Sequence, residues 1–168
     1  MNHKLIAIMA MTSDEVIAIN DKLPLKSKED MQHFKNTTLN NTVLMGRKTF
    51  DTLGKALPNR DNIVVSRNKI VNKEPNVYYT DTILKALHHA TLITKHKDIY
   101  VIGGSEIYKQ LVPLCDEFYL TVFHDFAEYN KNDKVTFSPY THQDIISMFT
   151  KVDKKYIDDG IIYHYTKE

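Results

Sequence analysis

The chain has 168 residues and a formal net charge of +1, and 42% of its residues are apolar. These values predict one domain, residues 1–168, with an ordinary buried core, and they exclude a global field that would steer the protein to nucleic acid or membrane. Because Cys115 stands alone and the N-terminal apolar run is too short for a signal or a span, we expect a cytoplasmic protein without an internal disulfide.

Apolar runs alternate with segments of helical period along the chain. We expect strands buried on both faces where the runs are continuous, and a flexible functional loop where no period persists. In chain order the sequence predicts a strand at 4–11, a long loop at 12–27, a helix at 27–38, a strand at 41–46, a short helix at 47–54, strands at 59–68 and 75–80, a helix at 81–93, a strand at 97–104, a helix at 105–112, a strand at 117–123 and a hairpin of 146–158 with 160–167. This order indicates an α/β fold with a mostly parallel central sheet, flanking helices and an antiparallel C-terminal hairpin.

Three of the expected strands end in basic or glycine-rich turns: Gly46-Arg47-Lys48, Ser66-Arg67 with Lys69 nearby, and Gly103-Gly104-Ser105. Ligands of open α/β sheets bind outside the carboxyl ends of strands. Cations at the start of a helix oppose its dipole unless a bound anion, such as a phosphate, lies there. A dinucleotide with an additional ribose phosphate fits this pattern, and solvated cations beside ordinary tight turns are the alternative.

Asp30 and Phe34 lie four residues apart on one face of the first predicted helix. One interpretation makes Asp30 the third residue of a capping box that begins at Ser27. In the other, its carboxylate lies in a cleft, where it accepts two parallel hydrogen bonds from an amidine-like ligand edge. Both hold together if the carboxylate turns away from the backbone. His88 and His89 are adjacent, so we expect them to be solvated and we predict no metal site.

The segments 5–38, 43–68 and 99–121, including "MGRKTFDTLGKALPNR" and "VIGG", resemble the dihydrofolate reductase family in its own order. The resemblance implies the single-domain fold of that family. It also implies NADPH-dependent reduction of 7,8-dihydrofolate, with hydride transfer to C6 and protonation at N5, in support of one-carbon metabolism and thymidylate synthesis. Diaminopyrimidine or pteridine antifolates are then expected inhibitors, and a monomer is expected from size and family.

The resemblance also assigns residues. Asp30, Thr121 and the loop residue Leu23 match positions that act in catalysis. The substrate positions are Ile6, Ala7, Ile8, Asp30, Met31, Phe34, Thr52, Leu53, Leu57, Arg60, Ile102, Tyr108 and Thr121, with Arg60 expected to hold the glutamyl carboxylate. The cofactor positions are Ala7, Ile8, Ile17, Asn20, Gly46, Arg47, Lys48, Thr49, Ser66, Arg67, Ile102, Gly103, Gly104, Ser105, Glu106, Ile107 and Gln110. In the turn that contains Gly103 and Gly104, the family has a cis Gly-Gly bond.

The chain departs from the family pattern at a few positions. Leu25 stands where bacterial members commonly carry Trp, and Ala18 and Ser105 replace glycines. Asn59 replaces the glycine before Arg60, and we expect the turn to survive because Asn tolerates the left-handed region. The family's loop Asp is placed at Asp133.

Two rival functions stay open at this point. One is a reductase of the same fold that acts on a pyrimidine or ribityl substrate of riboflavin synthesis. The other is a non-enzymatic nucleotide-binding or assembly protein. The pairing of a pocket acid with Arg60 favours folate, because a glutamyl tail requires a cation.

Overall fold

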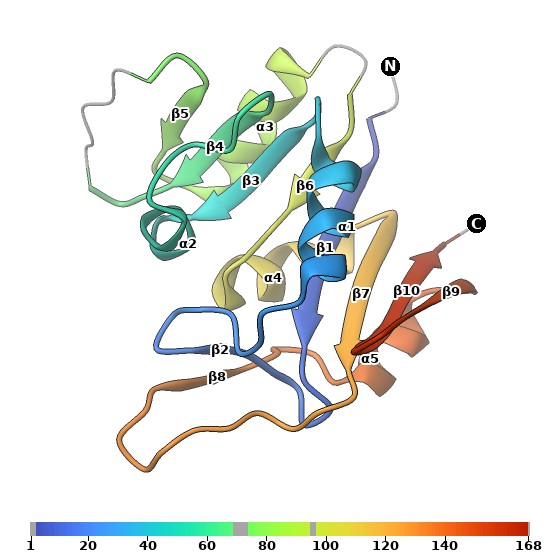
Figure 1. Ribbon diagram of the computed structural model, residues 1–168. Helices are drawn as coiled ribbons and strands as arrows, with labels where there is room; N and C mark the ends of the chain where they lie inside the picture. The colour runs from blue at the N-terminus through green and yellow to red at the C-terminus, as the bar shows by residue number, and fades with distance from the viewer. Residues whose placement is uncertain (1–2, 69–73, 95–96, 168) are drawn as a thin grey trace.

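The computed structural model describes residues 3–68, 74–94 and 97–167. Figure 1 shows one twisted sheet with helices on both faces and a small separate pair of strands below it. The strands are β1 (Leu5–Met11), β2 (Val16–Ile19), β3 (Thr42–Gly46), β4 (Asp61–Val65), β5 (Val77–Thr80), β6 (Ile99–Val101), β7 (Glu117–Phe123), β8 (Val135–Phe137), β9 (Lys151–Ile157) and β10 (Gly160–Thr166). The helices are α1 (Lys28–Thr38), α2 (Arg47–Leu53), α3 (Ile83–Ile93), α4 (Ser105–Leu111) and α5 (His142–Met148), with a 3-10 turn η1 (Val112–Leu114).

The central sheet has eight strands in the order β5-β4-β3-β6-β1-β7-β10-β9. Every neighbouring pair from β5 to β7 is parallel. By contrast, β10 runs antiparallel to both β7 and β9. The predicted α/β fold, mostly parallel with an antiparallel C-terminal hairpin, is therefore confirmed.

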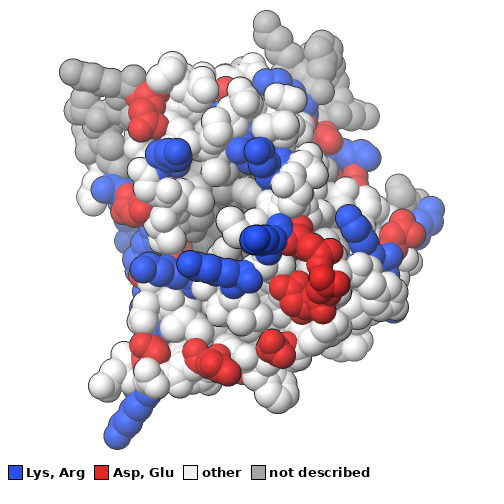
Figure 2. Space-filling model, in the orientation of Figure 1, with Lys and Arg blue, Asp and Glu red and all other residues white. Residues whose placement is uncertain are grey.

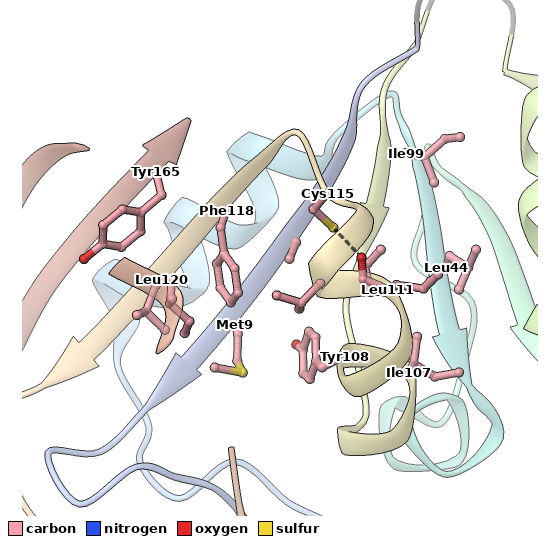
Figure 3. Packing of buried hydrophobic residues seen from close by; sticks show 14 of the residues in the cluster. Met9, Leu44, Ile99, Ile107, Tyr108, Leu111, Cys115, Phe118, Leu120 and Tyr165 are labelled. Atoms are coloured by element: carbon pink, nitrogen blue, oxygen red, sulfur yellow. Dashed lines mark hydrogen bonds between the residues drawn. The ribbon is translucent and has the colours of Figure 1, made fainter. Parts of the chain in front are cut away.

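The sheet is buried on both faces because its central strands carry apolar side chains at successive positions. Ile6 and Ile8 of β1 belong to the cluster that packs beneath α1 and α2. Ala7 and Met9, which point the opposite way, belong to the larger cluster beneath α3, α4 and α5. Figure 3 shows α4 directing its side chains onto β1 and β3, including Tyr108 close to Met9. Two cores thus hold α1, α2 and α4 over the carboxyl ends of the parallel strands.

Two segments differ from the sequence prediction. The expected loop at 12–27 contains β2, which pairs with β8 in a separate two-stranded sheet. The predicted strand at 146–158 is divided, because α5 begins in a capping box at Thr141 and only the later residues form β9. The two elements that were missed, β2 and α5, are short and pack against segments far away in the sequence, so neither gives a sustained local period.

The edge strand β9 is rich in charged residues, and all but its last residue are exposed. Charged side chains are common on edge strands because they discourage pairing with another chain. His88 is exposed as expected, but the ring of His89 packs 4.9 Å from that of Tyr78, and its Nε2 is buried. Within the described ranges, no helix is long and apolar enough to cross a membrane.

Candidate active site

The first and third strand ends meet in space. The backbone N–H of Gly46 donates to the carbonyl of Gly103 at 2.8 Å, and the Gly103-Gly104 peptide bond is cis. A Cβ on Gly46 would lie 3.3 Å from Ile107, and one on Gly103 would lie 3.1 Å from Tyr108. Gly103 also has a positive φ of 114°. Glycine is therefore required here so that the starts of α2 and α4 can approach each other.

Both helices start without a side-chain cap, because glycine occupies the cap position in α2 and in α4. Their first N–H groups are therefore available to an acceptor outside the chain. Arg47 at the start of α2 pairs with Asp51 through Nε at 3.0 Å and reaches Ser66 Oγ at 3.5 Å. Arg67, which follows Ser66 in the sequence, is exposed. All three predicted strand ends thus converge, while Lys69 lies outside the described residues.

Asp30 occupies the third position of α1, where its backbone takes part in the helix cap and its carboxylate is free for another role. Its backbone N–H donates to Ser27 Oγ at 3.1 Å, which is one half of a capping box. Its carboxylate turns away from the backbone instead of closing the box. There it accepts a hydrogen bond from Thr121 Oγ1 on β7 at 2.5 Å. The structure therefore brings together the two polar residues that the resemblance paired.

Burial raises the pKa of Asp30 above its ordinary value of 3.8, and the nearby charge of Asp159 raises it further. The hydrogen bond from Thr121 acts in the opposite direction but does not outweigh burial. A carboxyl group with a raised pKa in a cleft is a frequent mark of an active site. The hydroxyl of Tyr108 lies beneath the same region and donates to the carbonyl of Ile8 at 2.7 Å.

Several of the predicted substrate residues are exposed or half-buried apolar side chains. Phe34, Leu57 and Ile102 pack against the core under α1 and α2. Met31 and Leu53, by contrast, are 59% and 39% exposed. Figure 2 shows this face hollowed between α1 and α2, with Lys and Arg side chains around the hollow. A hollow bordered by apolar side chains, with the buried Asp30 carboxyl group on α1, suits a flat heterocycle that has an edge of hydrogen-bond donors.

Arg60, the residue before β4, is 5% exposed. Its Nε donates to the Pro58 carbonyl at 3.0 Å and one terminal nitrogen donates to Thr38 Oγ1 at 2.9 Å. Within residues 3–68, 74–94 and 97–167, no carboxylate pairs with this guanidinium. Asn59 has a φ of 58°, so the turn before Arg60 survives the loss of glycine as predicted. The remaining donors of Arg60 can therefore bind a carboxylate of a ligand.

The loop before α1 is tied to the loop before β8. Asn20 Nδ2 donates to Asp133 Oδ1 at 2.9 Å, so the Asn20 amide is directed to that loop rather than to the glycine turns. Lys134 pairs with Asp21 at 2.9 Å, and Thr52 donates to the Asp21 carbonyl at 3.1 Å. This loop therefore reaches α2.

The other predicted site residues divide into two groups. Leu23 is 62% exposed, so it is free to meet a ligand. Ser105, Thr49 and Lys48 lie at the helix starts, and Glu106 is exposed beside them. By contrast, Ile17 is buried in the core, and Gln110 lies one turn along α4, where it donates to Glu106. Ile6 and Ala7 are 2% and 0% exposed in β1, so their side chains offer almost no surface to a ligand.

Sequence reasoning missed three supporting residues. Asn62 is fully buried in β4 and bonds to the backbone of Leu57 and Arg60, which fixes the turn between them. A polar residue inside the apolar run "NIVV" was the available signal. Asp21 and Asp159 contact partners more than 100 residues away, so no local pattern could reveal them.

A family model for dihydrofolate reductase matches residues 4–165. Dihydrofolate reductase type 6 of Proteus mirabilis is 41% identical over 120 residues, which cover 71% of this chain and 74% of that protein. Dihydrofolate reductase type 15 of Escherichia coli is 35% identical over 147 residues, covering 86% and 92%. A solved structure of dihydrofolate reductase from Enterococcus faecalis, complexed with NADP(H) and RAB-propyl, matches with a TM-score of 0.78 at 30% identity, covering 97% of this chain and 95% of that one. These matches confirm the resemblance, and the chain belongs to the dihydrofolate reductase family of NADPH-dependent oxidoreductases.

Proposed function

We propose that Asp30 holds the pterin ring in this chain's reduction of 7,8-dihydrofolate to tetrahydrofolate. The observation that carries this role is the orientation of the carboxylate, which is largely buried and turns from its own helix to Thr121 on β7. A carboxylate there accepts two parallel hydrogen bonds, from the 2-amino group and N3 of a pterin. Residues 1–168 would serve this reaction as one domain.

NADPH, the cofactor of the family, supplies the hydride when it is bound. The residues present fit it, since the uncapped starts of α2 and α4 meet at Gly46 and Gly103 and offer free N–H groups. Arg47, Ser66 and Arg67 would hold the additional ribose phosphate that distinguishes NADPH from NADH. Lys48 and Thr49 would hold the phosphates nearer the nicotinamide.

The chain's own residues would act on the substrate by position and charge. Phe34, Leu57 and Ile102 would line the ring and exclude water, which strengthens the hydrogen bonds to Asp30. Asp30 would face the ring edge away from N5, and its charge would raise the basicity of N5 through the ring. A water molecule would then deliver the proton to N5, because the Asp30 carboxyl group would lie at the opposite edge of the ring.

Arg60 would hold the glutamyl tail of the substrate. Burial lowers the pKa of its guanidinium, but the group stays charged at neutral pH because its ordinary pKa is 12.5. Thr38 and Pro58 fix its orientation. A fixed planar fork suits a carboxylate, so the tail would enter along the end of α1. The same site would accept pteridine or diaminopyrimidine antifolates.

The cofactor preference can be tested by thermal unfolding with NADPH or NADH. We expect Arg67→Ala to reduce the stabilisation by NADPH and to leave that by NADH unchanged. A tenfold loss of affinity corresponds to about 1.4 kcal/mol. Lys151→Ala, which removes an exposed cation from the distant strand β9, is the matched control. Equal losses for NADPH and NADH in Arg67→Ala would contradict a ribose phosphate at this position.

A further inference from the structure

The turn between β9 and β10 is fixed against the end of β7. The carbonyl of Asp159 accepts a hydrogen bond from the His124 N–H at 3.0 Å. At the next residue, a Cβ on Gly160 would lie only 2.5 Å from the Val122 carbonyl oxygen, so the two backbones are in close contact. The backbone of Asp159 is therefore held in place by the sheet itself.

This turn also contacts the first turn of α1. Ser27 Oγ donates to Asp159 Oδ1 at 3.0 Å, and the Asp158 N–H donates to Glu29 Oε1 at 2.9 Å. Figure 2 shows acidic side chains gathered where α1 begins. The two contacts join α1 to residues about 130 positions later in the chain.

The hydroxyl of Ser27 links the turn to Asp30. A hydroxyl has one proton, and here that proton goes to Asp159. The oxygen lone pairs then face α1, where they accept the Asp30 N–H at 3.1 Å. Ser27 is 4% exposed, so water does not readily replace either partner.

We propose that Asp159 is a positioning residue for Asp30, acting through the Ser27 hydroxyl. The proposal rests on the proposed role of Asp30 in holding the pterin. Asp30 is then fixed from two sides, by Thr121 at its carboxylate and by Ser27 at its backbone. Both anchors belong to one frame, since β7 and β10 pair with Ile162 opposite Thr121.

Asp159 also affects Asp30 by its charge. The groups that face the Asp30 carboxyl group are the hydroxyl of Thr121 from β7, the phenol of Tyr108 from α4 and the carboxylate of Asp159 from the turn. The negative charge of Asp159 raises the pKa of Asp30 beyond the effect of burial. Removing that charge while keeping the hydrogen bond therefore separates its two effects.

Two substitutions at Asp159 make this separation. Asp159→Asn keeps an oxygen that accepts the Ser27 proton, so we expect the wild-type KM for dihydrofolate. Its Asp30 should titrate at lower pH, which carboxyl-carbon NMR of the free enzyme measures. Asp159→Ala removes the acceptor, and we expect a loss of about three- to tenfold in kcat/KM, mainly through KM. This is less than the roughly hundredfold cost of a full misplacement, because Thr121 still holds the carboxylate. Asp158→Asn, the same charge change in the same turn, should leave the KM for dihydrofolate and the titration of Asp30 unchanged.

A second variant keeps the test decisive if Asp159→Ala folds poorly. Ser27→Ala removes the link from the other end, and Asp159→Ala in that background should raise KM no further. A cap that is only structural would change the unfolding temperature but leave KM unchanged. Additive effects of Ser27→Ala and Asp159→Ala on KM, or a rise in KM for Asp159→Asn equal to that for Asp159→Ala, would overturn the proposal.

Asp30→Asn distinguishes this proposal from the proposed function. If that variant turns over like the wild type, the role of Asp30 is wrong and the positioning role falls with it. If Asp30→Asn is strongly impaired while Asp159→Ala keeps the wild-type KM, only the positioning role is wrong.

Discussion

Replacing Asp30 by Asn removes the charge of the side chain and keeps its shape. The backbone N–H of Asp30 still donates to Ser27, so the N-terminus of α1 keeps its cap. The amide oxygen of Asn can still accept the hydrogen bond from Thr121, which the carboxylate accepts at 2.5 Å in the wild type. We therefore expect the variant to fold, and its defect to lie in substrate binding and turnover.

The size of the defect follows from the hydrogen bonds expected at this carboxylate. Each hydrogen bond to a charged group contributes about 1.5–3 kcal/mol. Asn keeps one acceptor, but its amino group faces a second donor of the pterin, so one bond is replaced by a repulsive contact. A loss of about 2–4 kcal/mol corresponds to a reduction in kcat/KM of about thirty- to a thousandfold near neutral pH.

Steady-state oxidation of NADPH with dihydrofolate measures this reduction directly. Glu29→Gln is a matched control, because it makes the same charge change in the same helical turn and its oxygen can still accept the Asp158 N–H. We expect the control to stay close to the wild type. A kcat/KM for Asp30→Asn within about threefold of the wild type would refute the hydrogen-bonding argument.

Three further predictions concern stability. Because the pKa of Asp30 is raised in the folded state, ionising its carboxyl group destabilises the fold. The stability that the protonated carboxyl group contributes is present below pH 3.8 and is lost as the pH rises through the folded pKa. Asp30→Asn should therefore unfold at a higher temperature than the wild type at pH 7 and lose this advantage in acid. Burial, with the charges of Lys155 and His164, lowers the pKa of His33 to about 4. The stability contributed by the neutral imidazole is present above pH 6.5 and should be lost as the pH falls towards 4. In denaturant unfolding, His33→Gln should lose less free energy of unfolding over that pH interval than the wild type. Gly160→Ala places a methyl group 2.5 Å from a carbonyl oxygen and should cost about 3 kcal/mol or more in denaturant unfolding, whereas Gly54→Ala, with φ 76° and open space around it, should cost about 1–2 kcal/mol.

The sheet could be predicted from the sequence because its strands are continuous apolar runs. Ile6 to Met9 are buried on alternating faces, and this two-sided burial is what such a run indicates. The hairpin of β9 and β10 was predicted from its turn at Asp158, Asp159 and Gly160, but the start of β9 was placed too early because α5 ends just before it. β2 and β8 were missed because each is short and stable only against the other.

The candidate site could be predicted in its parts but not in its connections. Local spacing placed Asp30 on a helix and Gly46 at a strand end. It could not show that Gly46 would bond to Gly103, or that the Asp30 carboxylate would leave its capping position for Thr121. Those choices are made by packing between segments far apart in the sequence, and burial then sets the pKa of Asp30.

The central proposal is that the protein reduces dihydrofolate next to Asp30 and prefers NADPH to NADH. The direct measurement is the loss of NADPH absorbance by the purified protein with and without dihydrofolate, repeated with NADH. We predict oxidation that requires dihydrofolate and strongly favours NADPH. Oxidation that proceeds equally with NADH, or none with dihydrofolate while NADPH still raises the unfolding temperature, would contradict the proposed roles of the phosphate cluster or of Asp30.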